Sequence, residues 1–259
     1  MILDKFRLTD RVSIITGAAS GIGKSLAKGL AEAGSHIVVA DINESGAQRT
    51  CEEIRKIGVH AMPVKVDITD EEQTEEMVRR VEERFGRIDV LINNAGIGAR
   101  QEIEKMTYAD WKRMMDVNLN GVFLVSKAVG RVMIRQRKGS IINISSMSGL
   151  VVNVPQCQTA YNVSKAGVIM LTRSMALEWA KYNIRINTIA PGYMKTEMTA
   201  KDFEENLQTP MVQKWLEMTP MGRPGTPDEL QGIALYLASD ASSFATGGVF
   251  VVDGGYTLP

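Results

Sequence analysis

The chain has little of what metal centres and disulfide scaffolds need: its 259 residues include two cysteines and two histidines. Cys51 and Cys157 show neither a metal-binding spacing nor a disulfide framework. His36 and His60 stand at the starts of two predicted strands, where a structural role is the simplest interpretation. We therefore expect no bound metal, and the cysteine usage fits a reducing compartment.

Net charge is also missing, because 30 basic residues balance 30 acidic ones. Such a chain has no overall field to attract nucleic acid or an anionic membrane, so we expect neither as a partner. The segment Met1–Lys5 offers no long apolar targeting sequence. A cytoplasmic location is the expectation.

The sequence shows no linker, low-complexity run or internal repeat, and its 44% hydrophobic content suffices for one large domain over residues 1–259. Short apolar segments alternate with longer amphipathic ones, which predicts an α/β fold with a doubly wound parallel sheet and helices on both faces. The predicted strands cover residues 12–16, 36–41, 60–66, 88–93, 139–144, 185–190 and 247–252.

A glycine-rich turn follows the first predicted strand and opens a helix. Gly17, Gly21 and Gly23 are spaced G-x-x-x-G-x-G, with Ser20 and Ile22 between them. Glycines permit a tight turn and close approach to a pyrophosphate, and the free amides and dipole of the helix start favour its charge. The turn lacks the lysine order of a nucleoside-triphosphate loop. A purely structural glycine turn is the alternative.

Asp41 ends the second predicted strand, at the distance from the glycines where a ribose-binding acid is expected. Its carboxylate could accept hydrogen bonds from both adenosine ribose hydroxyls, and it would repel a 2′-phosphate. This favours NAD over NADP. Alternatively, Asp41 is only the N-cap of the helix that begins near residues 43–45.

Tyr161 and Lys165 are four residues apart, which places both side chains on one helix face. A nearby cation lowers a phenol pKa, so Tyr161 could act as a general acid and base. On its own the spacing is equally typical of a half-buried tyrosine with a lysine stem beside it.

Together these features resemble the short-chain dehydrogenase/reductase family over nearly the whole chain. Further segments match that family's motifs in its order: Asp67-Ile68, Asn94-Ala95-Gly96, Asn118, and Pro191-Gly192 with Thr196. The resemblance implies a Rossmann-like sheet with strand order 3-2-1-4-5-6-7. It also implies that Asn118 is catalytic and that the other matched segments, with Tyr161 and Lys165, contact the cofactor.

The catalytic serine implied by the resemblance has two candidates. The strand over residues 139–144 points to Ser146, whereas the count back from Tyr161 that many family members show points to Ser148. We favour Ser146, because a strand end fixes where a side chain points while a loop absorbs extra residues. Ser145 is expected to hydrogen-bond its own backbone.

The resemblance implies NAD-dependent interconversion of a secondary alcohol and a ketone, in which Ser146 and Tyr161 hydrogen-bond the reacting oxygen. Lys165 would hold the ribose and lower the pKa of Tyr161, and Asn118 would support a water-linked proton path. A 3-oxoacyl-thioester or other ketone reductase is the alternative, and a non-catalytic NAD-binding regulator is disfavoured because all four catalytic positions match. A homotetramer is expected by resemblance; Leu171, Met175 and Trp179 could serve an interface or the core equally well.

Substrate contacts are expected in two segments. The loop over residues 150–158 carries Asn153 and Gln156, whose amides suit a substrate with several hydroxyls, and resembles members that act on sugar alcohols and aldonates. Turn polarity would explain the same residues. The segment from Thr196 to Met221 reads as a lid. The predicted substrate-binding residues are Ser146, Ser148, Asn153, Gln156, Tyr161 and Met198.

Overall fold

The computed structural model describes residues 1–197 and 199–258, and its centre is one seven-stranded sheet in the order β3-β2-β1-β4-β5-β6-β7. Every neighbouring pair of strands is parallel. The strands are β1 (Val12–Thr16), β2 (His36–Asp41), β3 (Ala61–Lys65), β4 (Val90–Asn93), β5 (Gly139–Ile144), β6 (Ile184–Pro191) and β7 (Val249–Val252). The predicted fold class and the strand order implied by the resemblance are confirmed.

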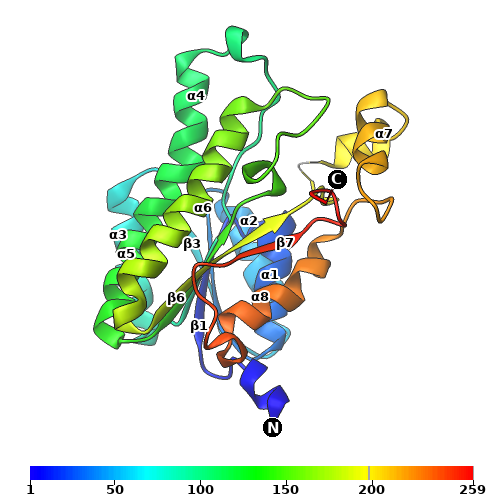
Figure 1. Cartoon of the computed structure of the whole chain (residues 1–259). Helices are drawn as coiled ribbons and strands as arrows, with labels where there is room; N and C mark the ends of the chain where they lie inside the picture. The colour runs from blue at the N-terminus through cyan, green and yellow to red at the C-terminus, as the bar shows by residue number, and fades with distance from the viewer. Residues whose placement is uncertain (198, 259) are drawn as a thin grey trace.

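Helices cover both faces of this sheet (Figure 1). One layer consists of α1 (Gly21–Glu32), α2 (Glu44–Arg55) and α8 (Gln231–Ala238). The opposite layer consists of α3 (Glu71–Phe85), α5 (Gly121–Gln136) and α6 (Thr159–Trp179), with α4 (Tyr108–Met115) continuing into α5. Helix α7 (Pro210–Glu217) stands apart from both layers, near the C-terminus in Figure 1.

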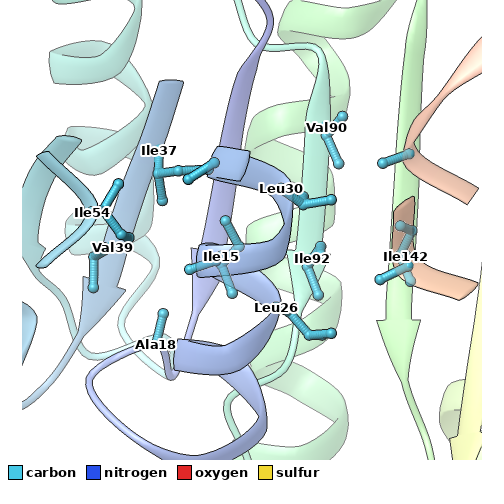
Figure 2. Close-up of a cluster of buried hydrophobic side chains, with 14 of the residues drawn as sticks. Ile15, Ala18, Leu26, Leu30, Ile37, Val39, Ile54, Val90, Ile92 and Ile142 are labelled. Atoms are coloured by element: carbon cyan, nitrogen blue, oxygen red, sulfur yellow. The ribbon is translucent and has the colours of Figure 1, made fainter. Parts of the chain in front are cut away.

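Each strand contributes side chains to the cores on both faces of the sheet, because successive side chains point to opposite faces. Ile15 packs beneath α1 with Leu26 and Leu30 (Figure 2), whereas Ile14 packs in the layer of α3, α5 and α6. Burial on both faces explains why the strands read as apolar runs without alternation. Two hydrophobic cores therefore cover the two faces of the sheet. The edge formed by the carboxyl ends of the strands stays open and can form a binding site.

The helical stretch Tyr108–Gln136 is long and apolar enough to cross a membrane by length and composition alone, but 56% of its most apolar window is buried within the molecule. Its outer face carries Lys127 and Arg131, which pair with Glu71 and Glu75 of α3 at 2.6 and 2.8 Å. This is the pattern of a helix that covers a sheet.

The three apolar positions on α6 singled out in the sequence pack toward the core of the protein. Met175 is buried between α6 and the sheet, with Leu171 and Trp179 packed against the same cluster. An added Cβ on Gly130 of α5 would lie 2.3 Å from the Trp179 ring, so this glycine lets the two helices approach. The large apolar side chains that α6 leaves exposed are Val163, Met170 and Leu177.

Candidate active site

The carboxyl ends of the strands open into one pocket of about 1120 Å3. In an open parallel sheet this is the edge where ligands bind. The pocket wall includes these predicted site residues: Gly17, Ser20, Gly21, Ile22, Asp41, Asp67, Ile68, Asn94, Ala95, Gly96, Ser146, Ser148, Tyr161, Lys165, Pro191, Gly192 and Thr196. Gly23 and Asn118 are buried behind the wall, and Met198 lies outside the described residues.

The glycine turn is built for close approach. Gly17 and Gly21 have φ of +66° and +55°, a region that favours glycine. A Cβ on Gly23 would lie 2.3 Å from the carbonyl oxygen of Gly17 and 2.4 Å from Nδ2 of Asn94. That Nδ2 donates to the carbonyl oxygens of Thr16 and Gly17 at 3.0 and 3.1 Å. The start of α1 is thereby held at the pocket wall, where its amides fit a pyrophosphate.

Asp41 joins the turn to the end of β2. Its Oδ2 accepts from the amide of Ala19 at 2.9 Å, and its Oδ1 accepts from the amide of Asn43 at 2.8 Å. The helix cap is a different residue, because the side chain of Asn43 accepts from the amide of Gly46 at 3.1 Å. The N-cap interpretation of Asp41 is therefore wrong, and its carboxylate faces the pocket beside the glycine turn.

Asp67 shapes the next turn. Its Oδ1 accepts from the amide and hydroxyl of Thr69 at 2.9 and 2.7 Å, which fixes the chain after β3. Ile68 and Thr69 then form part of the pocket wall, as does Val117. An apolar wall with a carboxylate beside it suits a heteroaromatic base.

Ser146, Tyr161 and Lys165 meet at the pocket because α6 is tied to the end of β5. Lys165 Nζ donates to the carbonyl oxygen of Ile144 at 3.0 Å and lies 5.6 Å from the centroid of the Tyr161 ring. The hydroxyl of Ser145 donates to the carbonyl oxygen of Lys165 at 2.7 Å. The expectation that Ser145 bonds its own backbone is therefore wrong: it fastens the tyrosine helix to the sheet.

The two serine candidates touch each other. Oγ of Ser146 lies 3.1 Å from both Oγ and the amide nitrogen of Ser148. Burial raises the pKa of Tyr161, and the hydroxyl of Ser146 opposes part of that rise, which favours Ser146 as the serine beside the phenol. Ser148 lies one step further from it and contacts Gln158, whose Nε2 is 3.2 Å from its Oγ.

Asn118 sits in a π-helical turn, Asp116–Asn120, between α4 and α5. Its Oδ1 accepts from the amide of Ile97 at 2.8 Å, and its Nδ2 donates to the carbonyl oxygen of Ile97 and to Oγ of Ser164. A π-turn inside a helix is frequent at functional sites. Here it fixes the chain after β4 against the helix that carries Tyr161.

Burial is the largest influence on the pKa values of Tyr161 and Lys165. It raises the pKa of Tyr161, against the smaller lowering by Ser146, and it lowers the pKa of Lys165 to about 8. In the protein alone burial outweighs any lowering of the Tyr161 pKa, so the effect of Lys165 on that pKa stays a prediction. Both groups share one desolvated site, in which the charged form of each is disfavoured.

The substrate loop is arranged differently from the prediction. Gln156 accepts from Nε1 of Trp215 and donates to the hydroxyl of Tyr193, both at 2.8 Å. Asn153 accepts from Nε2 of Gln158, also at 2.8 Å. Within the described part of the chain neither amide belongs to the pocket wall, which Gln158 and Tyr193 help to form. Gln156 ties the loop to α7 through Trp215.

Arg100 and Asp202 are among the charged wall residues that sequence reasoning missed. They form a two-pronged ion pair, with Nη1 to Oδ1 at 2.9 Å and Nη2 to Oδ2 at 2.6 Å. The pair joins positions 102 residues apart. No local pattern could have revealed it, because Arg100 lies in a loop after β4 and Asp202 in the short helix Lys201–Glu205.

A parallel sheet that brings a dinucleotide cradle and a Ser–Tyr–Lys cluster to one pocket is the arrangement of a nicotinamide-dependent oxidoreductase. A family model described as enoyl-(acyl carrier protein) reductase matches residues 17–257. The chain belongs to the short-chain dehydrogenase/reductase family, whose members use a nicotinamide cofactor, and it is an oxidoreductase of CH–OH groups.

Three relatives illustrate the similarity. Galactitol 2-dehydrogenase of Rhizobium johnstonii is 44% identical over 98% of this chain and 97% of its own length. A 3-oxoacyl-acyl-carrier-protein reductase of Thermotoga maritima is 42% identical over 97% of this chain and 100% of its own length. The solved gluconate 5-dehydrogenase of Burkholderia cenocepacia, a complex with NADP and tartrate, is 41% identical with a TM-score of 0.92 and full coverage of both chains.

Proposed function

We propose that this protein is an NAD-dependent dehydrogenase that interconverts a secondary alcohol and a ketone on a polyol, sugar alcohol or sugar acid. The observation that carries the proposal is the meeting of Ser146, Tyr161 and Lys165 in the pocket that also holds the glycine turn. The relatives named for galactitol and gluconate support this substrate class. The amide and phenol groups of Gln158 and Tyr193 in the wall support it as well, because they can hydrogen-bond hydroxyls.

Proton transfer is assigned to Tyr161. In oxidation its phenol oxygen takes the hydroxyl proton of the alcohol, and in reduction it returns that proton. Ser146 would hold the reacting oxygen, and Lys165 would bind the ribose and carry positive charge beside the phenol. Asn118, fixed between Ile97 and Ser164, would support a water-linked proton path behind them.

The bound nicotinamide would supply the hydride chemistry. We assign the pyrophosphate to the turn Gly17 to Gly23 with Ser20 and Ile22, the adenosine to Asp41, Asp67, Ile68, Asn94, Ala95 and Gly96, and the nicotinamide end to Pro191, Gly192 and Thr196. Asp41 favours NAD, since its carboxylate would face a 2′-phosphate at short range. The solved gluconate 5-dehydrogenase is a complex with NADP, so NAD and NADP are both offered in the test.

The segment from Thr196 to Met221, with α7, is proposed as a lid over a single domain that spans the chain. Support comes from its small separate core of Phe203, Val212 and Trp215. We propose that the protein is a cytoplasmic homotetramer. Support for interfaces between subunits comes from exposed apolar side chains, namely Met170 and Leu177 on α6 and Phe244 before β7.

The test is a panel of hexitols, aldonates, 3-hydroxyacyl thioesters and steroids, each offered with NAD and with NADP, with the reduced nicotinamide followed by its absorbance. We expect turnover with hexitols or aldonates and a preference for NAD. The relative from Thermotoga maritima keeps 3-oxoacyl-thioester reduction as the second candidate. Turnover confined to thioesters with NADP would replace the proposal with that candidate.

A further inference from the structure

The loop after β4 and the lid place an arginine and an aspartate together in the substrate part of the pocket. The amide of Gln101 donates to the carbonyl oxygen of Cys157 at 2.9 Å, so Arg100 lies beside the loop that leads into the Tyr161 helix. Asp202 reaches the same place from the short helix Lys201–Glu205. Both side chains belong to the pocket wall.

Their pairing neutralises the arginine. Two N–H donors of Arg100 bond the two carboxylate oxygens of Asp202 at 2.9 and 2.6 Å, the geometry that binds carboxylates most strongly. The guanidinium also lies 4.7 Å from the centroid of the buried Trp215 ring. The Asp202 side chain is 11% exposed and that of Arg100 is 40% exposed, so the carboxylate is largely desolvated while solvent reaches the pair from the arginine side.

A substrate carboxylate would have to displace Asp202 from Arg100 and then lie beside it. That leaves a partly buried aspartate without its cation, and the two carboxylates repel. A hydroxyl has no such conflict, because it can accept from the remaining N–H donors of Arg100 and donate to an Asp202 oxygen. The paired site therefore discriminates by charge.

We propose that the Arg100–Asp202 pair selects neutral polyols and ketoses over sugar acids, with Asp202 occupying the place that an aldonate carboxylate would take. This inference rests on the proposed function and narrows its substrate class. Arg100 and Asp202 then act as specificity-determining residues, and the chemistry at Tyr161 is unchanged.

The experiment compares kcat/KM for hexitols and for aldonates in the wild type, in Asp202→Asn and in the double variant Arg100→Gln/Asp202→Asn. We expect the wild type to favour hexitols by about tenfold or more, and Asp202→Asn to raise kcat/KM for aldonates about tenfold, because Arg100 becomes free to bind a carboxylate. The double variant should lose that gain. Glu217→Gln is the control, since it removes an exposed acid of the same lid that pairs with Lys214 at 3.0 Å; its ratio should stay at the wild-type value.

The outcomes separate the two claims. A wild type that turns over aldonates as well as hexitols overturns the charge selection and leaves the proposed function standing. The same holds if Asp202→Asn lowers both activities equally, because the pair would then only hold the lid. A wild type inactive on both substrate classes overturns the proposed function itself.

Discussion

Tyr161 and Lys165 lie in a site where burial disfavours the charged form of both side chains. The phenol is therefore a weaker acid than a free tyrosine in the protein alone, and positive charge beside it is needed to favour the phenolate. Two other residues position the site through single hydrogen bonds. Ser145 holds α6 against the end of β5, and Asn118 holds the chain after β4. Reactivity and position are thus supplied by different residues.

Tyr161→Phe removes the proposed proton carrier and keeps the ring. We expect turnover to fall about 1000-fold or more, since general acid–base catalysis contributes on that order. Binding of NADH, measured by its fluorescence, should stay within about twofold. Tyr182→Phe, which alters a phenol just beyond the C-terminal end of α6, is the control and should leave both quantities unchanged. Normal turnover in Tyr161→Phe would sink the assignment.

Lys165→Met tests the buried charge. The folded protein binds this proton less tightly than the unfolded chain, because the pKa falls from 10.5 to about 8. The penalty is full below pH 8 and disappears as the pH rises from 8 to 10.5. At pH 7 it is about 3 kcal/mol, partly offset by the hydrogen bond to Ile144, so we expect the variant to be more stable by about 1 to 2 kcal/mol.

That advantage should shrink between pH 8 and 10 when unfolding of the cofactor-free proteins is measured by denaturant titration. The same variant should bind cofactor more weakly. A stability difference that stays constant over this pH range would contradict the effect of burial on Lys165.

Among the elements, the β1–turn–α1 unit depends on Gly23. The Cβ of Gly23→Ala would press on the carbonyl oxygen of Gly17 and on Asn94, so the turn must open. We expect affinity for NADH to fall about 100-fold, as a displacement near 1 Å at a binding site can produce. Gly232→Ala in α8, where an added Cβ meets nothing within 4 Å, is the matched control. Equal affinities in the two variants would refute the cradle.

Helix α7 is held to the substrate loop by Trp215 and Gln156. Trp215→Phe keeps an aromatic ring but loses the 2.8 Å hydrogen bond from Nε1. We expect KM for the alcohol to rise about fivefold, the equivalent of one hydrogen bond, with the affinity for NADH unchanged. Trp111→Phe on α4 controls for the loss of an indole. An unchanged KM in Trp215→Phe would show that this contact does not position the lid.

The sequence predicted the secondary-structure elements better than the contacts between them. Apolar runs and the glycine turn have local signatures, so the strands and the pocket edge could be predicted, whereas the strand order followed from the resemblance to the family. Gln156 was predicted to bind substrate from its amide alone, yet its partners Tyr193 and Trp215 are distant in sequence. The raised pKa of Tyr161 was missed for the same reason, because desolvation depends on everything packed around the phenol.

For the whole molecule, two rigid cores leave one open edge, and the strand ends and helix starts at that edge supply the groups of the pocket. The proposed lid has a third, smaller core of its own. Under the proposals above, the layers supply stability, the β1–β2 side selects the cofactor, and the β4 loop and lid select the substrate.

Hydride transfer from a secondary alcohol to NAD is the central claim, and isotope transfer tests it most directly. The purified protein is incubated with NAD and a hexitol deuterated at its carbinol carbons, and the reduced cofactor is analysed by mass spectrometry. We predict one deuterium in each NADH formed, with its formation abolished in Tyr161→Phe. NADH that carries no deuterium, or no NADH from any alcohol of the panel, would contradict the account.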